Sequence, residues 1–485
     1  MRLTLAALAA AATVLAGCDL APTYKVPTVA VPVSFHDTAI WQKAQPSDTL
    51  PRSDWWKGFN DPLLDKLEAD LNAQNFTLAA ATATYQQARA NAAEAVAGLY
   101  PSIIVNGAVD KTSFPQDGVL KAHGLPTSFQ VFNSLDGGLQ YEFDFWDRVQ
   151  NTVVAGKAAA QASAADLAFI RLSLEAELAT DYLLLRGLDA QRDLLVHTVE
   201  AYQQALDVAS NRFNGAIASG MDVSRAKAQL ESARAQLEDV QARRAMAEHA
   251  IASLIAVPAP AFSIPPDLAE ISLPELPSAL PSVLLQRRPD IASAERQVLA
   301  TNALIGVARS AFYPNVSLAV IGGLQSSGLS LFNLPNSFWS LGPGLTLPIF
   351  EGGLLNAQEA AAIASFNMTA ANYRNTVVTA FQDVEDALAQ LHWYAAEEAD
   401  DKRAVAAAQQ TLTMSMALYK DGATNFLEVV VAQESLLGSQ QALLQLQTLY
   451  LQSGVRLIRA LGGGWSAADL PKPDDTPLTH VDIQM

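Results

Sequence analysis

The side chains that most often carry out catalysis or bind metals are scarce in this sequence, and their spacing matches no catalytic pattern. The six histidines show no i, i+4 pair and have no partner cysteine, which argues against a zinc site. There is neither a glycine-rich phosphate loop nor a nucleophile elbow. The acidic cluster of Asp383, Glu385 and Asp386 lies in a long helical stretch, where such clusters are usually solvated. We therefore expect no enzyme activity, no metal and no cofactor.

The single cysteine, Cys18, is the residue whose setting does predict chemistry. Arg2 supplies a positive start, and a short apolar stretch follows it, as in a secretory signal peptide. The run Leu15-Ala16-Gly17-Cys18 is similar to a bacterial lipobox, in which the cysteine becomes the new N-terminus and is acylated. We predict a signal peptide at 1–17 and a lipid on Cys18. The alternative is a signal peptide with an incidental cysteine.

Asp19 leaves the destination of such a lipoprotein open, because in enteric bacteria an aspartate at this position tends to hold lipoproteins at the inner membrane. After Cys18 there is no run of about 18 or more apolar residues, so we expect no transmembrane helix. If the chain spans a membrane, it should do so with strands. The formal net charge of −18 argues against a nucleic-acid partner, which needs basic patches.

The strongest structural signal is the stretch 128–147, SFQVFNSLDGGLQYEFDFWD. Alternate positions are mainly apolar on one face and mainly polar or acidic on the other, with aromatic residues gathered at one end. The run is longer than an ordinary strand of about 5–6 residues. This pattern is typical of an outer-membrane barrel strand, which turns its apolar face to lipid. A strand of a soluble sandwich is the alternative.

The same order of elements returns in the second half of the chain. Tyr100-Pro101 corresponds to Tyr313-Pro314, and Tyr141-Glu142-Phe143 corresponds to Leu345-Thr346-Leu347. The stretch 212–215 corresponds to 419–422, at an offset of 207 residues. Each half therefore reads as helix, strand, loop, strand and long helical hairpin. Apolar residues recur every seven positions in the first hairpin, interrupted at three charged positions, and this predicts coiled-coil packing.

These signals divide the chain into an extended arm, two repeats, a linker and a tail. The arm covers 18–60 and begins at the lipidated cysteine. The first repeat covers 61–256, with a helix, strands near 102–112 and 128–146, and a hairpin near 150–256. A proline-rich linker covers 257–283. The second repeat covers 284–465, with a helix, strands near 315–323 and 337–350, and a hairpin near 353–461; the tail is 466–485.

Four strands per chain cannot close a barrel, and an open sheet edge in lipid leaves backbone groups unpaired. Several chains must therefore share one barrel. Two chains would give eight strands, whose interior is filled by side chains, whereas three would give twelve and leave a lumen. The polar inner faces favour the trimer. We predict an α/β membrane protein with a shared trimeric transmembrane β-barrel, continued by a long α-helical coiled-coil barrel.

Several segments resemble a known family. They are the lipobox at Cys18, WWKGFNDP at 55–62, LLQRRPDIASAE at 284–295, ARSAFYPNVSL at 308–318 and LGGGW at 461–465. Together they resemble the TolC-like outer-membrane factors, and specifically the NodT-type lipoprotein branch that serves RND-type tripartite efflux pumps. The resemblance implies a homotrimer with a 12-stranded barrel, a periplasmic helical tunnel and an equatorial belt, in which we expect Arg287 and Arg288 to form salt bridges.

The resemblance also implies the function. The chain would be an outer-membrane exit duct that passively conducts drugs or other small molecules from an RND-type inner-membrane transporter and a periplasmic membrane-fusion adaptor. It would be anchored to the outer membrane through Cys18, with a large periplasmic portion. The alternative is a periplasmic coiled-coil scaffold or surface adhesin without a pore, which would have no lipid-facing strands.

Residues of a periplasmic gate follow from the same resemblance. The second hairpin tip supplies Tyr419, Asp421, Thr424 and Glu428, of which Glu428 falls on a gate-acid position. Val431 stands where many relatives carry an aspartate, so we expect Glu428 to supply most of the gate charge. The alternative for Glu428 is a solvated acid on a helix.

Overall fold

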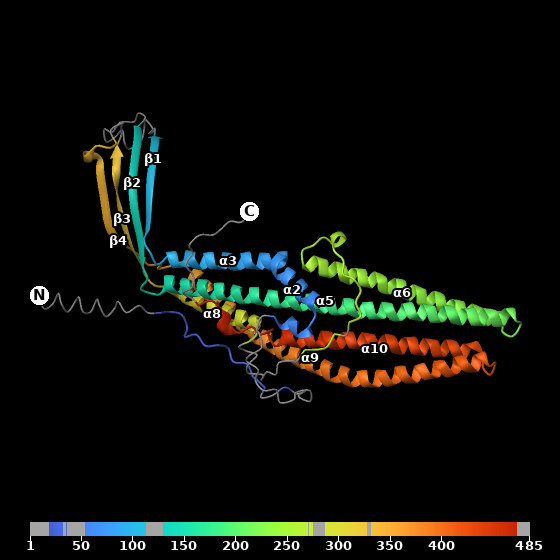
Figure 1. Ribbon diagram of the computed structural model, residues 1–485. Coiled ribbons are helices and arrows are strands. Elements are labelled where there is room, and N and C mark those ends of the chain that lie inside the picture. Colours follow the sequence, from blue (N-terminus) through green and yellow to red (C-terminus); the bar gives the residue numbers. More distant parts are fainter. Residues whose placement is uncertain are drawn as a thin grey trace.

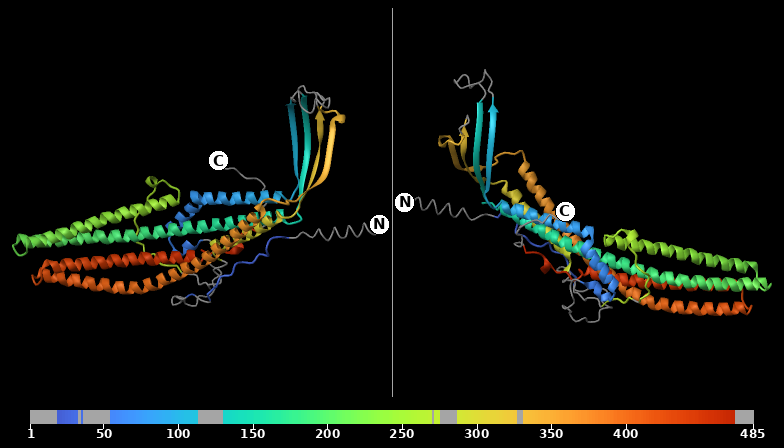
Figure 2. Two further views of the ribbon diagram at one scale, coloured as in Figure 1. Left: turned by 180° about the vertical axis from the view of Figure 1, so that it is seen from behind. Right: turned by 45° about the horizontal axis from the view of Figure 1, so that its top comes forward.

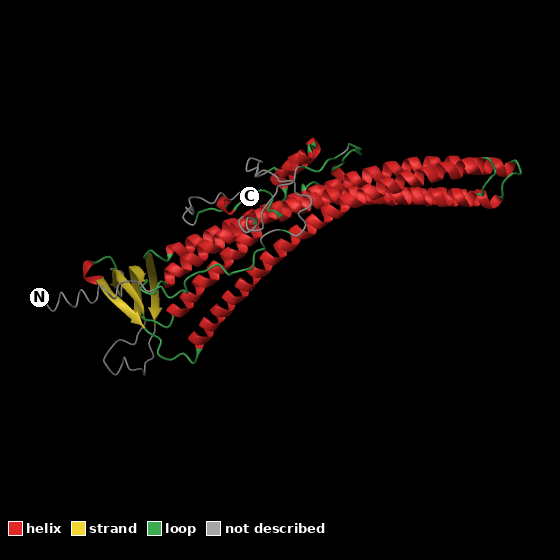
Figure 3. Ribbon diagram, turned by 90° about the horizontal axis from the view of Figure 1, so that it is seen from below, coloured by secondary structure: helices red, strands yellow, loops and turns green. Residues whose placement is uncertain are grey.

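The computed structural model describes residues 19–32, 35, 54–112, 130–269, 271–274, 287–326 and 331–472. Over these residues the chain forms a four-stranded sheet at one end and a bundle of long helices that extends away from it (Figure 1). Two helical hairpins turn at the end farthest from the sheet (Figure 2; Figure 3). The predicted signal peptide at 1–17 and Cys18 lie outside the described residues, as do residues 270 and 275–283 of the proline-rich linker.

The sheet is antiparallel, with the strand order β1-β2-β3-β4. Its strands are β1 (Ser102–Thr112), β2 (Gln130–Phe143), β3 (Asn315–Ser326) and β4 (Ser337–Thr346). The register places Ile103, Leu139, Val320 and Leu341 in one row across all four strands. The apolar face is therefore continuous across the two repeats.

Much of this apolar face is open in the single chain. The side chains of Ile103 and Val105 on β1 and of Trp339 and Leu345 on β4 are each more than two-thirds exposed. On the other face Asn106 donates a hydrogen bond to Asp136, with 3.1 Å between Nδ2 and Oδ2. One apolar and one polar face, with a free edge at β1 and at β4 in the single chain, are what a shared membrane barrel requires.

Two strands end earlier than the sequence predicts. β2 stops at Phe143 rather than 146, because the Asp144 carboxylate accepts hydrogen bonds from the amides of Val149 and Gln150 and so starts the next helix. β4 stops at Thr346 rather than 350, where Pro348 has no amide hydrogen for a further ladder bond. β3 is longer than predicted, because its pairing with β2 continues to Ser326.

Seven helices of more than ten residues are present in the described chain. They are α2 (Pro62–Gln74), α3 (Phe76–Ala97), α5 (Arg148–Asn214), α6 (Gly220–Leu254), α8 (Pro289–Ser310), α9 (Leu354–Lys420) and α10 (Phe426–Ala460). The first repeat thus opens with two helices rather than one. Asn75 separates them, since its side chain caps α3 by accepting from the Leu78 amide and donates to the Leu254 carbonyl oxygen.

The helical hairpins of the two repeats have the same dimensions. α5 and α9 are each 67 residues long, α6 and α10 are each 35, and each helix of the second hairpin begins 206 residues after its counterpart. The offset of 207 predicted at the tip is wrong by one residue. Ala216 and Gly422 are equivalent because both have positive φ, and Ser219 and Asn425 are equivalent helix caps.

By length and composition alone, one helix among the described residues, α5, could cross a membrane, whereas the sequence predicted none. α5 instead lies within the bundle, where it packs against α3, α6, α8 and α10. Its largest buried side chains, including Leu178, Tyr182 and Leu195, share a core with Leu64 and Leu71 of α2. The apolar composition of α5 therefore reflects packing against other helices of the same chain.

A buried charge network fastens the described part of the linker to this core. Asp189 accepts hydrogen bonds from Arg186, at 3.0 Å, and from Arg244, at 2.6 Å. The same two guanidinium groups donate to the carbonyl oxygens of Pro265 and Ile264. Because each charged group has several partners, the network can be buried without leaving a charge unpaired.

Candidate functional site

The two hairpin tips have similar geometry, because each begins its second helix with a polar cap. The Ser219 hydroxyl accepts a hydrogen bond from the Met221 amide at 3.1 Å, and the Asn425 side chain accepts from the Leu427 amide at 3.0 Å. Gly422 adopts φ +77°, which allows the tight turn after α9. Both tips are therefore closed by local hydrogen bonds.

An apolar cluster joins one tip to the other. The first hairpin contributes Ala205, Ala209 and Ala226, which are small and allow close approach. The second contributes larger side chains, among them Phe426 and Val429, which are fully buried. The tips therefore pack as one unit within a single chain.

Tyr419 lies at the centre of this contact. Its ring is only 2 % exposed and meets Phe426 edge to face, with ring centroids 5.1 Å apart. The Arg212 guanidinium of the first hairpin lies over the same ring at 4.9 Å, and Arg212 Nη1 donates to the Lys420 carbonyl oxygen at 2.7 Å. A cation–π contact and a charged hydrogen bond therefore connect the end of α5 to the end of α9.

Asp222 adds a negative charge beside this contact. Burial raises the pKa of the Tyr419 hydroxyl, the Asp222 carboxylate raises it further, and the Arg212 guanidinium opposes both effects. Tyr419 is therefore uncharged at neutral pH. The neutral ring packs between the guanidinium group of Arg212 and the ring of Phe426.

The structure distributes the predicted gate residues between this core and the surface. Tyr419 is buried between the hairpins, whereas Asp421 and Glu428 are exposed and Thr424 is half-buried. Glu428 lies in the first turn of α10, where a negative charge favours the helix dipole. The exposed carboxylates of Asp421 and Glu428 remain available to other chains or to a lumen.

The sequence placed Arg212 and Asp222 at or beside the first hairpin tip, but it predicted no functional role for either residue. Asp222 is the equivalent of Glu428 at the offset of 206 residues, and each is the acid in the first turn of its helix. An alignment with that offset would have found Asp222. Arg212 has no such signal, because its equivalent is Leu418 and its contact with Tyr419 joins distant parts of the chain.

Arg287 and Arg288 were predicted to form salt bridges in an equatorial belt, and Arg288 does form salt bridges. It pairs with Asp290 at 2.7 Å and with Asp383 at 3.0 Å, and it also donates to the Ala460 carbonyl oxygen. Asp383 is therefore an ion-pair partner rather than only a solvated acid. These bonds join the start of α8 to α9 and α10.

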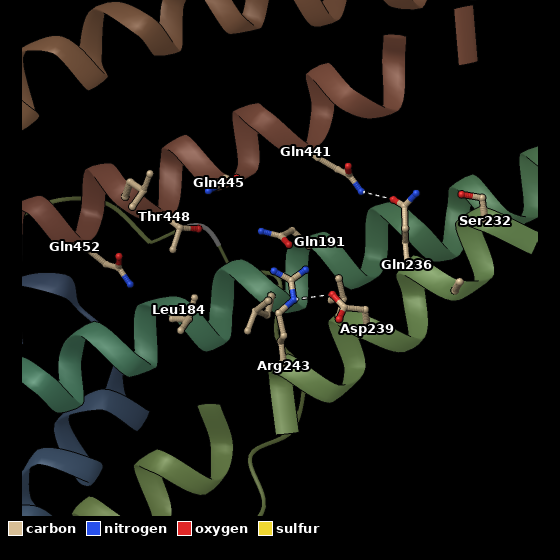
Figure 4. Close-up of a pocket in the computed structure, with 14 residues that line it drawn as sticks. Leu184, Gln191, Ser232, Gln236, Asp239, Arg243, Gln441, Gln445, Thr448 and Gln452 are labelled. Carbon is tan, nitrogen blue, oxygen red and sulfur yellow. Dashed lines mark hydrogen bonds and ion pairs between the residues drawn. The ribbon is translucent and has the colours of Figure 1, made fainter. Parts of the chain in front are cut away.

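A groove of about 590 Å³ with a mixed lining lies between α5, α6 and α10 (Figure 4). Glutamine and apolar side chains both line it, and Gln441 Nε2 donates to Gln236 Oε1 at 3.0 Å. Asp239 and Arg243 form an exposed ion pair at its edge. Across the part of the chain that the structure describes, no group of three or more His, Cys, Asp or Glu side chains could hold a metal ion.

Comparison with known proteins identifies relatives over almost the whole chain. The family model described as "Outer membrane efflux protein" matches residues 68–257 and 280–463. The pyoverdine export outer membrane protein OpmQ of Pseudomonas aeruginosa is 31% identical over 434 residues, covering 87% of this chain and 89% of OpmQ. The solvent efflux pump outer membrane protein SrpC of Pseudomonas putida is 30% identical over 468 residues, covering 94% and 97%.

Solved structures of outer-membrane channels have the same fold. The outer-membrane channel OprN has a TM-score of 0.82 and 27% identity, covering 92% of this chain and 100% of OprN. The outer membrane protein VceC of Vibrio cholerae has a TM-score of 0.78 and 27% identity, covering 86% and 99%. The residues matched by the family model include all four strands and both hairpins.

Proposed function

The chain belongs to the outer membrane efflux protein family, and we propose that it works with a periplasmic membrane-fusion adaptor and an RND-type transporter. It is an outer-membrane efflux channel with a periplasmic portion, built as a trimer with a shared barrel. The family is one of channels rather than enzymes. The comparisons give no support to the alternative of a scaffold or adhesin without a pore.

The observation that carries the proposal is that the family match spans both repeats of a chain whose sheet has two free edges. Relatives are named for the export of pyoverdine and for the efflux of solvents, toluene and antibiotics. Such different cargoes argue for a duct that conducts small molecules passively. Selection among cargoes then belongs to the transporter and the adaptor.

The partnership can be tested in a bacterial strain that lacks its own exit ducts. Expression of this chain together with a cognate adaptor and RND-type transporter should lower the accumulation of a fluorescent efflux substrate. Expression of the chain without the transporter should leave accumulation unchanged, because a passive duct supplies no driving force. A reduction that needs neither adaptor nor transporter would contradict the tripartite assignment.

The lipid anchor at Cys18 is part of the proposal. Its support is the lipobox sequence and the position of Asp19, which contacts α5 near the end of the bundle that joins the sheet. Labelling with a clickable fatty acid should be lost in Cys18→Ala, while the trimer still forms because the barrel buries far more apolar surface than acyl chains do. Labelling that persists in Cys18→Ala would exclude this anchor.

We place the periplasmic gate at the hairpin tips, with Glu428, Asp421 and Thr424 near the axis and Tyr419 as the packed residue behind them. In a threefold tube, one acid per chain becomes a ring of three carboxylates, and such rings favour cations. Glu428→Gln should therefore lower cation preference in planar bilayers, with Glu231→Gln on the exposed face of α6 as the control. Loss of selectivity in Asp421→Asn but not in Glu428→Gln would move the ring to the turn itself.

A further inference from the structure

The residues that follow Cys18 lie in a groove built by two helices of different repeats. Asn151 of α5 and Asn302 of α8 are each only 5 % exposed, and both point their amide groups at this segment. Asn151 Nδ2 donates to Asp19 Oδ1 at 3.0 Å, and Asn302 Nδ2 donates to the Pro22 carbonyl oxygen at 2.8 Å. Buried amides need partners, and residues 19–22 supply them.

Gly306 forms the floor of this groove. A Cβ atom at Gly306 would lie 2.8 Å from Ala21 Cβ, 2.9 Å from the Ala21 backbone nitrogen and 2.6 Å from Asn151 Nδ2. These separations are too short for atoms that are not bonded to each other, so the segment can lie this close to α8 only because residue 306 has no side chain. Arg309, three residues further along α8, donates to the Leu20 carbonyl oxygen at 3.3 Å.

The segment continues along the same surface beyond the groove. Tyr24 packs with Ile291 and Val298 of α8 and donates its hydroxyl hydrogen to Glu295. Further on, Phe35 is buried among side chains of α9 and α10. Contacts of this kind at several points along the segment show that it is docked on the helices through protein contacts alone.

Asp19 is the first residue of this docked segment that the structure describes. Its Oδ1 also accepts a hydrogen bond from the Ala21 amide at 2.9 Å, which shapes the turn that leads into the groove. Consecutive Cα atoms are about 3.8 Å apart, so Asp19 determines where the preceding residue can be. Arg309, in the last turn of α8, lies close to the start of β3 at Asn315, so this point is at the base of the sheet.

We propose that Asp19 is a positioning residue, which pins the mature N-terminus to the crossing of α5 and α8 through Asn151 and so holds the lipid anchor at the base of the barrel. Only the statement that a lipid is held there rests on the proposed acylation of Cys18; the docking of the N-terminus by Asp19 does not. The pin itself depends on hydrogen-bond geometry: Asp19 acts as an acceptor, and its negative charge is not required.

Trypsin cleavage after Lys25 in the full-length trimer measures the docking. Lys25 is exposed, but a protease needs the residues on both sides of it in an extended conformation away from α8. Asp19→Ala should speed cleavage about fivefold, which corresponds to a net hydrogen bond of about 1 kcal/mol. Asp19→Asn keeps the acceptor oxygen and should stay within about twofold of the native chain.

Two further variants test the partners. Asn151→Ala should speed cleavage by no more than Asp19→Ala, which also loses the bond from the Ala21 amide. The double variant should be no faster than Asp19→Ala, because both substitutions remove the bond between Asn151 and Asp19. Gly306→Ala should speed cleavage after Lys25 by at least about tenfold, because the added Cβ displaces the segment. This is expected even though alanine stabilises the helix itself by roughly 1 kcal/mol relative to glycine. Heat dissociation of the trimer, measured alongside, separates loss of docking from loss of folding.

The outcomes distinguish the pin from the lipid. Unchanged cleavage in Asp19→Ala, or Asp19→Asn as fast as Asp19→Ala, would overturn the positioning role. Additive effects of Asp19→Ala and Asn151→Ala would also overturn it, because the two residues would then act separately. The mass of the released N-terminal peptide reports acylation independently, so an unmodified peptide would exclude the lipid anchor while the cleavage rates still test the pin.

Discussion

The two helical hairpins share one backbone frame but bury different helices. In the first hairpin most buried positions belong to the long helix α5, whereas in the second they belong to the short helix α10. Figure 1 shows the reason: α5 and α10 lie side by side in the middle, and α6 and α9 lie at the two edges. One chain therefore covers α5 and α10 but leaves α6 and α9 for neighbouring chains.

Equivalent positions make the difference explicit. Gly187 of α5 corresponds to Trp393 of α9, which is 64 % exposed in the single chain. Asp189 corresponds to Ala395, and Glu175 corresponds to Phe381. The first repeat thus carries close helix contacts and buried polar groups at places where the second carries apolar side chains. A duplicated backbone can therefore hold two different kinds of packing, one within the chain and one for assembly.

Asp189→Ala, which disrupts the buried polar packing of the first repeat, should cause the largest loss of stability. The substitution leaves Arg186 and Arg244 without their shared carboxylate in a buried setting, and we expect a loss of about 3–5 kcal/mol in stability. The measurement is denaturant unfolding of the trimer at one protein concentration. Asp239→Ala breaks an exposed ion pair with Arg243 and should cost less than about 1 kcal/mol. Equal effects of the two would mean that the network is no more important than a surface pair.

Buried carboxyl groups should make the first repeat sensitive to pH. Burial raises the pKa of Glu175 to about 7, and burial next to Glu175 raises that of Glu68 to about 10. The folded chain therefore holds protons that the unfolded chain has lost, so stability should fall as pH rises from about 4.5 to 7. For Glu175 the loss is about 3 kcal/mol.

Glu175→Gln should remove that part of the pH dependence, as measured by denaturant unfolding at pH 5 and pH 7. Glu231→Gln on the exposed face of α6 is the control and should leave the change in the free energy of unfolding between pH 5 and pH 7 as it is in the native chain. If Glu175→Gln leaves the dependence of the free energy of unfolding on pH unchanged, Glu175 is ionised in the folded chain.

Gly187→Ala tests the close contact between α5 and α10. An added Cβ would lie 2.2 Å from Thr448 Oγ1, and overpacking of this kind costs about 1–3 kcal/mol, partly offset by the helix propensity of alanine. We expect a net loss of about 1–2 kcal/mol, measured as the heat dissociation of the trimer. The double variant with Thr448→Ala should recover most of it, because the clashing hydroxyl is removed. If the double variant is as unstable as Gly187→Ala, the contact is not the cause.

The sequence predicted the class of fold and the function, and both are confirmed. The strand within 128–147 was recognisable because a sheet with one face toward lipid and one toward water produces a period of two. The long hairpins were recognisable from the absence of proline and the recurrence of apolar residues. The lipid on Cys18 and the gate role of Glu428 remain predictions.

Contacts between distant segments were not predictable in the same way. Asp189 and Arg244 are charged residues in helices with exposed faces, and no local pattern marks them as buried partners. The break at Asn75 was missed because one asparagine inside an alanine-rich stretch does not end a helix unless a distant carbonyl, here that of Leu254, binds it. The tip offset was wrong because glycine was aligned with glycine, whereas Ala216 takes the equivalent positive φ.

Arg212→Ala at the half-buried tip should have the smallest effect on stability, about 1 kcal/mol. It nevertheless tests most directly how the two repeats differ. The first repeat supplies the cation and the second the ring, so the contact exists only because the repeats differ. With the gate at the tips, as proposed, the channel opens when the two hairpins of each chain separate there. A change of about 1 kcal/mol shifts the balance between closed and open tips about fivefold, which should appear as a higher open probability in planar bilayers. Leu418→Ala, at the equivalent position of α9, removes an exposed side chain and should leave conductance unchanged. If Leu418→Ala opens the channel as much as Arg212→Ala does, the tips are held by apolar packing between chains rather than by the contact of Arg212 with Tyr419.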